Sequence, residues 1–234
     1  MKLQTPKKFN ETEHDTWCRL FKNLEHSRQH QAHPTFAKGV EILEISHERI
    51  PDIVEVNKLL KNATGWQGAM VEGLEENEDF FTGLRNRTFP IGNFIRDADD
   101  ISYTPEPDIF HDLYGHLPWL ADPDMAEFMY QFGVESCKYL EDPEALKKFG
   151  RLFWFAVEFP LIQTSKGKRI FGGGILSSYG ESNYCLSDKP NVLDFDVGVI
   201  RDKDYRIDVM QEDIFILKNP EQLYNCLPDF VAGL

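Results

Sequence analysis

Two histidines in the segment HDLYGH are the residues of this sequence whose types and spacing first suggest metal chemistry. They are His111 and His116, and Glu158 follows later in the apolar segment FWFAVEFPLI. Two imidazoles and one carboxylate are the ligand set that holds Fe(II) on one face and leaves other positions open for dioxygen, water or a substrate. The three residues therefore predict a mononuclear non-haem iron site.

The spacing of the two histidines puts a condition on that site. Residues five apart on a regular α-helix point roughly 140° away from each other, so His111 and His116 can share a metal only if the helix is distorted or ends between them. Gly115 or a single π-turn would allow this. Spacing alone favours surface or capping histidines, but Glu158 shifts the balance, since buried carboxylates are rare unless paired, hydrogen-bonded or metal-bound.

A rival pair of histidines, His26 and His30, lies four residues apart, which is the better helical geometry for sharing a metal. Its surroundings (NLEHSRQHQAH) are polar, and no apolar segment there supplies a carboxylate. A solvated helix face is therefore the favoured interpretation of this pair.

Two further residues could contact a small ligand. Arg96, in NFIRDADD, could bind a carboxylate through two hydrogen bonds, although a surface ion pair with Asp97 or Asp99 is the simpler local interpretation. Trp154 lies one helical turn before Glu158 and could form an aromatic wall beside the metal, or only fill the core.

A run of glycines precedes Ser177 and Ser178. Small residues at such a place would let a ligand approach the backbone closely, whereas the alternative is an ordinary flexible turn.

The elements that must position these residues are expected to be mostly helices. Apolar spacing and punctuation by proline and glycine predict helices over 11–31, 51–65, 75–84, 104–120, 122–140, 142–159 and 219–227, with Pro118 and Pro160 ending two of them. The segment 88–95 is expected to be a loop or an edge strand, and strands are expected near 192–200 and 205–217. Together these predict a mainly α fold with a minor β part.

Length and charge limit the remaining possibilities. The chain of 234 residues suits one domain over 1–234, with a helical segment over about 1–40 packed on the rest. The net charge of −14 disfavours nucleic acid and anionic membrane surfaces as partners. No stretch approaches the roughly 20 apolar residues of a membrane span, and the first residues do not read as a signal peptide, so the cytoplasm is expected.

The four cysteines are far apart and form no C-x-x-C pair, which leaves zinc-ribbon and disulfide-scaffold interpretations without support.

Several ordered segments resemble one family, the pterin-dependent aromatic amino acid hydroxylases. The segment 103–128 (YTPEPDIFHDLYGHLPWLADPDMAEF) resembles the family signature, FWFAVEF resembles its third-ligand helix, and GGILSSYGESNYCLS resembles its serine-serine segment. The blocks 64–66 and 73–96 and the spacing between all of these also fit, so the resemblance covers roughly residues 40–217. It implies the single catalytic domain of that family, with Fe(II), a tetrahydropterin and O2 as cofactors and cosubstrates.

The resemblance also implies roles for individual residues. It assigns the iron to His111, His116 and Glu158. It assigns the pterin to Gly73, Leu74, Phe80, Asp112 and Phe153. It assigns the amino-acid substrate and its pocket to Arg96, Thr104, Glu106, Pro107, Trp154 and Ser177. Asp112 and Glu106 are in addition candidates for orienting the imidazoles.

The chain departs from animal members at three positions that bear on the pterin. Asp112 stands where they have glutamate, Phe153 where the mammalian phenylalanine member has tyrosine, and Glu75 where the pterin loop has an apolar residue. The chain resembles the compact bacterial members, without the regulatory and tetramerisation segments of animal members. A monomer without allosteric activation is therefore expected.

The substrate is expected to be phenylalanine, converted to tyrosine. Trp154 stands where tryptophan hydroxylases carry a smaller phenylalanine, and Ile207 falls near an aspartate of tyrosine hydroxylases. Tryptophan 5-hydroxylation and phenylalanine 3-hydroxylation remain the alternatives within the family. A non-catalytic protein that binds a metal or an amino acid is the alternative from another class.

Overall fold

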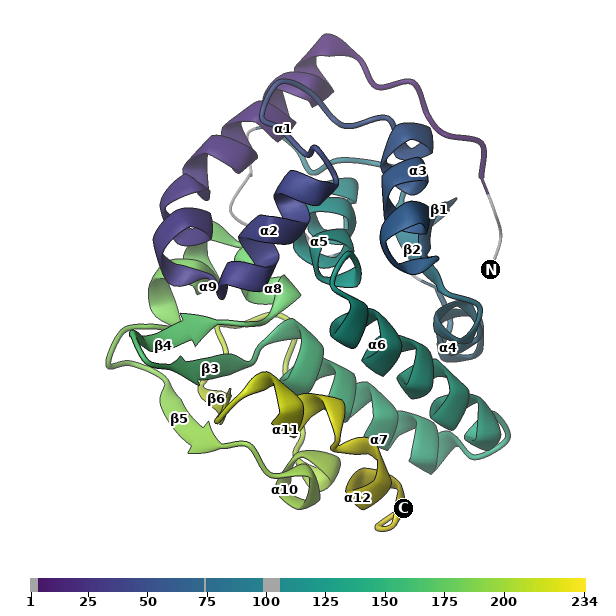
Figure 1. Ribbon diagram of the computed structural model, residues 1–234, viewed down its shortest axis with the longest axis vertical. Coiled ribbons are helices and arrows are strands. Elements are labelled where there is room, and N and C mark those ends of the chain that lie inside the picture. Colours follow the sequence, from purple (N-terminus) through teal and green to yellow (C-terminus); the bar gives the residue numbers. More distant parts are fainter. Residues whose placement is uncertain (1–3, 74, 99–105) are drawn as a thin grey trace.

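The computed structural model describes residues 4–73, 75–98 and 106–234, and it confirms a mainly α fold with a minor β part (Figure 1). The helices are α1 (Glu11–Asn23), η1 (Ser27–Gln31), α2 (Pro34–Ile42), α3 (Ile53–Thr64), α4 (Asn77–Arg85), η2 (Phe110–His116), α5 (Leu117–Leu120), α6 (Pro123–Ser136), η3 (Cys137–Tyr139), α7 (Pro143–Phe153), η4 (Trp154–Glu158), α8 (Gly173–Leu176), α9 (Tyr179–Tyr184), α10 (Val197–Asp202), α11 (Pro220–Tyr224) and α12 (Leu227–Val231). Three of them, η1, η2 and η4, are π-helical, and η3 is a 3₁₀ turn.

The strands form two small sheets. In one, β1 (Gln67–Val71) pairs in parallel with β2 (Thr88–Gly92). The other has the order β4-β3-β6-β5, built from β3 (Leu161–Thr164), β4 (Gly167–Ile170), β5 (Asn191–Asp194) and β6 (Asp213–Leu217). Strands β3 and β4 form a hairpin, while β6 runs parallel to both of its neighbours.

Local sequence explains where the predicted helices begin and end. At α1, the Asn10 side chain accepts from the Glu13 backbone N–H while the Glu13 side chain accepts from the Asn10 backbone N–H, which is a complete capping box. At α3, Asp52 caps the first turn, and Gly65 ends the helix with a left-handed φ of 81°.

An aromatic-rich core fixes how these helices pack. Trp17, Leu20 and Phe21 of α1 are all buried, as is Leu24 directly after this helix. Burial of each such side chain contributes roughly 1.5–3 kcal/mol. In Figure 1, α1, α2 and α3 lie in the upper half, α10 and α12 lie at the bottom, and α5 and α6 lie between them.

Several sequence-based boundaries were wrong. Pro118 does not end a helix: it occupies the first turn of α5, where its missing N–H costs nothing. Of the strand expected near 192–200, the first part is strand β5, but 197–202 is the helix α10, because Asp196 caps its first N–H groups. Of 205–217, only β6 is strand. The segment 88–95 contains β2, an edge strand of a two-stranded sheet, which is one of the two alternatives expected there, and this strand is fully buried. The sequence patterns do not predict α2 and β1.

Within the part of the chain that the structure describes, no helix is both long and apolar enough to cross a membrane.

Candidate metal centre

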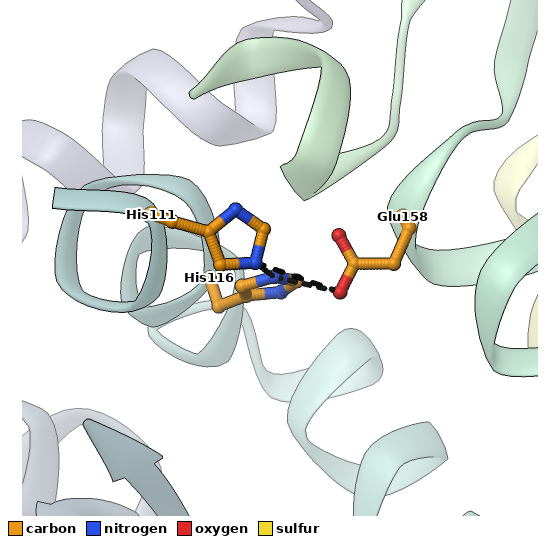
Figure 2. A group of neighbouring side chains, drawn as sticks. All are labelled: His111, His116 and Glu158. Atoms are coloured by element: carbon orange, nitrogen blue, oxygen red, sulfur yellow. Dashed lines mark hydrogen bonds and ion pairs between the residues drawn. The ribbon is translucent and has the colours of Figure 1, made fainter. Parts of the chain in front are cut away.

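A π-helix brings the two histidines of HDLYGH to one side. Hydrogen bonds in a π-helix join residues five apart, so His111 and His116 fall on the same face of η2. Figure 2 shows both rings directed at the Glu158 carboxylate, which arrives from a different helix. The distortion that the spacing required is therefore present.

The distances between the three donor atoms suit one metal ion. His116 Nε2 lies 3.0 Å from Glu158 Oε1 and 3.1 Å from His111 Nε2, and His111 Nε2 lies 3.8 Å from Glu158 Oε1. Metal–ligand bonds of about 2.1 Å at right angles would place two donors about 3 Å apart. The triad thus fits a divalent cation bound on one face.

Glu158 is buried in a way that calls for a cation. Its Oε2 atom is buried without a hydrogen-bond partner among the described residues. Although burial opposes ionisation, His116 and His111 hold the pKa of Glu158 well below its usual range. An ionised, partly unsatisfied carboxylate between two imidazoles is a chemically suitable donor set for Fe(II).

Ser177 fixes the orientation of the His111 ring. Its hydroxyl lies 2.9 Å from His111 Nδ1 and donates to the carbonyl of Gly174 at 3.2 Å. The hydroxyl lone pair then accepts from Nδ1–H, which leaves the Nε2 lone pair directed at the metal position. The family resemblance assigns Ser177 to the substrate, and in the structure its hydroxyl contacts a metal ligand.

The negative charges around His111 favour a cation at this site, either a proton on the imidazole or a metal ion. Burial disfavours a charged His111, but Glu158, with Asp112 and Asp108, raises its pKa to about 9. The pKa of His116 is lowered by burial and by the neighbouring His111. A divalent cation would take the place of the proton that the carboxylates hold on His111.

The glycines before Ser177 are needed by the triad itself. A Cβ atom on Gly174 would lie 2.7 Å from Glu158 Oε2, and one on Gly173 would lie 2.7 Å from His116 Cε1. A Cβ on Gly172 would lie 2.1 Å from the Glu158 carbonyl oxygen. These glycines let α8 approach the protein's own ligands, so the run is neither a flexible turn nor, by itself, a ligand subsite.

Gly174→Ala is therefore expected to lower the affinity for Fe(II) by roughly 10- to 100-fold, the range found when a group that orients metal ligands is disturbed. The new methyl group must push Oε2 aside. Metal titration by calorimetry measures the loss. Gly150→Ala is the matched control, because the nearest atom to its Cβ lies 3.9 Å away. Equal affinities in the two variants would contradict the prediction.

Arg96 is buried, and the structure pairs it with Asp108; of the two aspartates considered from local sequence, Asp99 lies outside the described residues. Its Nε and Nη2 atoms each donate to the Asp108 carboxylate at 2.8 Å, and Asp108 Oδ1 also accepts from the His111 backbone N–H at 2.9 Å. Despite burial, Arg96 and these N–H groups hold the pKa of Asp108 below its usual range. One carboxylate thus joins the candidate substrate-binding cation to the helix that carries the metal ligands.

Aromatic rings surround His116. Phe89 stacks on its imidazole with ring centroids 4.8 Å apart, and Phe153 is nearly parallel to it at 6.2 Å. Phe80 meets Phe153 edge-on at 5.0 Å. Phe80 and Phe153, two residues assigned to the pterin, therefore lie beside one another, and Phe153 lies next to a metal ligand.

The other residues that the resemblance assigns to the pterin or the substrate pocket differ in burial and in their contacts. Asp112 is buried and accepts from the Gly92 backbone N–H at 2.7 Å, and burial raises its pKa to about 7. It lies 3.9 Å from His111 Nε2, too far for a hydrogen bond that would orient the ring. Glu106 is exposed and Pro107 is half-buried. Gly73 has a left-handed φ of 71°.

Two of the assigned residues, Leu74 and Thr104, lie outside the described residues. Trp154 is half-buried at the start of η4, four residues before Glu158.

The rival histidines do not form a comparable site. His26 and His30 are exposed, with ring centroids 5.1 Å apart. Among the described residues, His111, His116 and Glu158 are the one group of three or more metal-binding side chains that comes together.

Glu181, which sequence analysis had not singled out, is a buried carboxyl whose pKa differs strongly from its ordinary value. Burial raises the pKa to about 7, against the opposing effect of the Gln211 backbone N–H. The folded protein therefore binds a proton that the unfolded chain has released between about pH 4.5 and 7, so the free energy of unfolding falls as pH rises through that window.

Glu181→Gln is expected to remove this dependence. The variant should be more stable than the wild type above pH 7, by on the order of 2 kcal/mol, and equal to it near pH 4. Urea unfolding at several pH values measures the difference. The same substitution at the exposed Glu55 should leave the pH profile unchanged. A stability difference between Glu181→Gln and the wild type that does not grow between pH 5 and 7 would contradict the assignment.

Sequence reasoning missed Asp108, Phe89 and the glycine contacts. Asp108 could have been suspected as a helix N-cap candidate directly before the histidine motif, but its pairing with Arg96 depends on tertiary structure.

Comparisons with known proteins agree with this geometry. Residues 4–234 match the family model described as biopterin-dependent aromatic amino acid hydroxylase. The chain is 39% identical over 225 residues to the phenylalanine-4-hydroxylase of Chromobacterium violaceum, covering 95% of this chain and 75% of the relative. It is 37% identical to that of Pseudomonas aeruginosa, covering 97% and 86% of the two chains.

Solved structures lead to the same family. The C. violaceum phenylalanine hydroxylase with bound iron(III) and oxidised 7,8-dihydrobiopterin superposes with a TM-score of 0.92 at 37% identity, covering 98% of this chain and 86% of that one. The phenylalanine hydroxylase of Legionella pneumophila gives a TM-score of 0.91 at 36% identity, covering 99% and 95%. The predicted resemblance is thereby confirmed: this chain belongs to the biopterin-dependent aromatic amino acid hydroxylase family.

Proposed function

We propose that this protein hydroxylates free phenylalanine to tyrosine, with iron held by His111, His116 and Glu158. The observation that carries the proposal is the convergence of these three donors, all within 4.8 Å of one another, in a member of the aromatic amino acid hydroxylase family. Activation of dioxygen is the chemistry that bound iron and a reduced pterin supply together.

The residues around the metal have distinct tasks in this proposal. Ser177 keeps His111 in the tautomer that offers Nε2 to the metal. The rings of Phe89 and Phe153 cover His116 and exclude water from that side. Phe80, beside Phe153, offers a ring face on which a pterin could stack.

Arg96 and Trp154 are proposed to hold the amino acid. The ion pair with Asp108 uses two of the five guanidinium N–H donors and keeps the group buried and oriented, so a substrate carboxylate would bind the others. Trp154, one turn before Glu158, would bound the space for the substrate ring. Roles for Gly73, Leu74, Asp112, Thr104, Glu106 and Pro107 follow the family assignment.

Phenylalanine is favoured over the other rings. The relatives in C. violaceum and P. aeruginosa are phenylalanine-4-hydroxylases, and a bulky tryptophan at position 154 suits a one-ring substrate. Tryptophan 5-hydroxylation and phenylalanine 3-hydroxylation are the competing outcomes of the test.

Turnover of phenylalanine, tyrosine and tryptophan, each with Fe(II) and a tetrahydropterin, tests the proposal. Chromatography of the products should show para-tyrosine from phenylalanine as the fastest reaction. Meta-tyrosine, or faster use of tryptophan, would keep the family and overturn the substrate assignment. Binding of phenylalanine without oxygen consumption in the presence of Fe(II) and pterin would support a non-catalytic binding protein.

We further propose that the protein acts as a cytoplasmic monomer. All four cysteines are free, as is usual in a reducing compartment, and the net charge of −14 opposes self-association. Light scattering coupled to size-exclusion chromatography should give the mass of one chain, 27.1 kDa.

A further inference from the structure

The Trp154 ring is held from several directions. One face stacks on Tyr205 with ring centroids 4.4 Å apart and an angle of 12° between the planes, and Phe159 lies 4.5 Å away at 36°. The indole N–H donates to Gln211 Oε1 at 2.9 Å. The stacking fixes the plane of the ring, and the hydrogen bond fixes its rotation within that plane.

Gln211 is the buried member of an otherwise exposed loop. Residues 203–212 join α10 to β6 without regular structure, and those from 204 to 210 are exposed, whereas Gln211 is 5% exposed. Its Nε2 donates to the carbonyl oxygens of Arg206 at 2.8 Å and Val209 at 3.1 Å. The side-chain amide therefore closes the loop on itself while its oxygen serves the indole.

The chemistry of these contacts demands an amide. The indole nitrogen is a donor only, and the two backbone carbonyls are acceptors only. A carboxylate of the same length would satisfy the indole but not the carbonyls, and an apolar side chain would satisfy neither. The assignment of oxygen and nitrogen in Gln211 follows from the same requirement.

Gln211 also contacts the segment that carries Ser177. Its backbone N–H donates to Glu181 Oε1 at 3.2 Å, and Glu181 lies in α9, directly after that segment. Three parts of the candidate site thus meet at one residue: the loop 203–212, the helix that carries Trp154 and Glu158, and the chain that follows Ser177.

We propose that Gln211 is a positioning residue that fixes the rotation of the Trp154 indole within its plane and so makes the site prefer the single ring of phenylalanine over the larger ring system of tryptophan. The inference rests on the proposed function, since it takes Trp154 as the wall of the substrate pocket. Without the hydrogen bond, the indole can rotate on Tyr205 and enlarge the space beside the metal.

Gln211→Met tests the proposal, with Gln222→Met as the matched control. Gln222 is a partly buried glutamine that likewise joins backbone groups, accepting from Lys218 N–H and donating to the Phe195 carbonyl, but it makes no contact with Trp154. The ratio of kcat/KM for phenylalanine to that for tryptophan is expected to fall about fivefold in Gln211→Met, as loss of one hydrogen bond of ordinary strength allows. It should stay unchanged in Gln222→Met.

Two further comparisons separate positioning from loss of structure. In a Trp154→Phe background, which lacks the indole N–H, Gln211→Met should change the ratio no further. Gln211→Glu keeps the acceptor for the indole and should retain most of the preference although the loop loses its two donors. A ratio as low as that of Gln211→Met would assign the effect to loop anchoring and overturn the proposal.

The same assays distinguish the two levels of inference. If wild-type protein hydroxylates no aromatic amino acid, the proposed function fails. If the wild type forms tyrosine while Gln211→Met keeps the wild-type ratio, or loses it equally in the Trp154→Phe background, only the role of Gln211 fails.

Discussion

Glu158→Ala is expected to abolish tyrosine formation and to lower the affinity for Fe(II) by more than about 100-fold. Disturbing groups that merely orient metal ligands already costs about 10- to 100-fold, and this substitution removes the one anionic donor of the triad. It also leaves His111 and His116 facing each other at 3.1 Å without the carboxylate between them. Iron content after dialysis and turnover with phenylalanine measure the two effects.

The control for this substitution is Glu48→Ala, which removes an exposed carboxylate far along the chain from the triad. It should bind iron and turn over like the wild type. Full activity of Glu158→Ala would contradict the assigned ligand set, and loss of iron in both variants would point to general unfolding instead. Far-ultraviolet circular dichroism of the iron-free proteins checks the fold.

Asp108→Ala is expected to destabilise the fold by about 3–5 kcal/mol, the cost of leaving a buried cation without its partner. Arg96 and Asp108 side chains are 5% and 0% exposed. The substitution also removes the acceptor for two backbone N–H groups. One belongs to Arg96, and the other belongs to His111 at the start of the metal-binding helix η2. Urea unfolding of the iron-free protein measures the loss, and substrate affinity should fall with it.

The exposed pair Arg206–Asp208 provides the comparison. Its Nη2–Oδ2 distance, 2.7 Å, is close to that of the buried pair, but its side chains are 68% and 57% exposed. Solvent screens such a pair, so Asp208→Ala should leave the unfolding midpoint unchanged. Equal effects of the two substitutions would show that burial of the Arg96–Asp108 pair carries no special weight.

The parts of the site that could be predicted from sequence are those whose interacting residues lie close together along the chain. The histidines, Glu158 and the need for a distorted helix followed from residue types and spacing, because the geometry of a helix turn is local. The roles of the glycine run and of Ser177 could not be read that way, since their partners lie on other helices. From local sequence, Arg96 was compared with its neighbours Asp97 and Asp99, whereas the structure pairs it with Asp108, twelve residues further along.

The secondary structure was likewise predictable where the signals are local and unpredictable where it depends on tertiary contacts. Capping and apolar periodicity located α1 and α3 well, because each signal acts within a few residues. Short elements were less predictable: α10 was expected to be strand, and β1 was not expected at all. Such elements are decided by what they pack against rather than by intrinsic propensity.

Residue types and spacing were enough to predict the donor set, the family, the mainly helical fold and an iron- and pterin-dependent enzyme. Three contacts became visible only in the folded chain: Ser177 with His111, Asp108 with Arg96, and Gln211 with Trp154. The physical reason is common to all three. Each is a hydrogen bond between segments distant in the chain, which exists only once the core has brought those segments within about 3 Å.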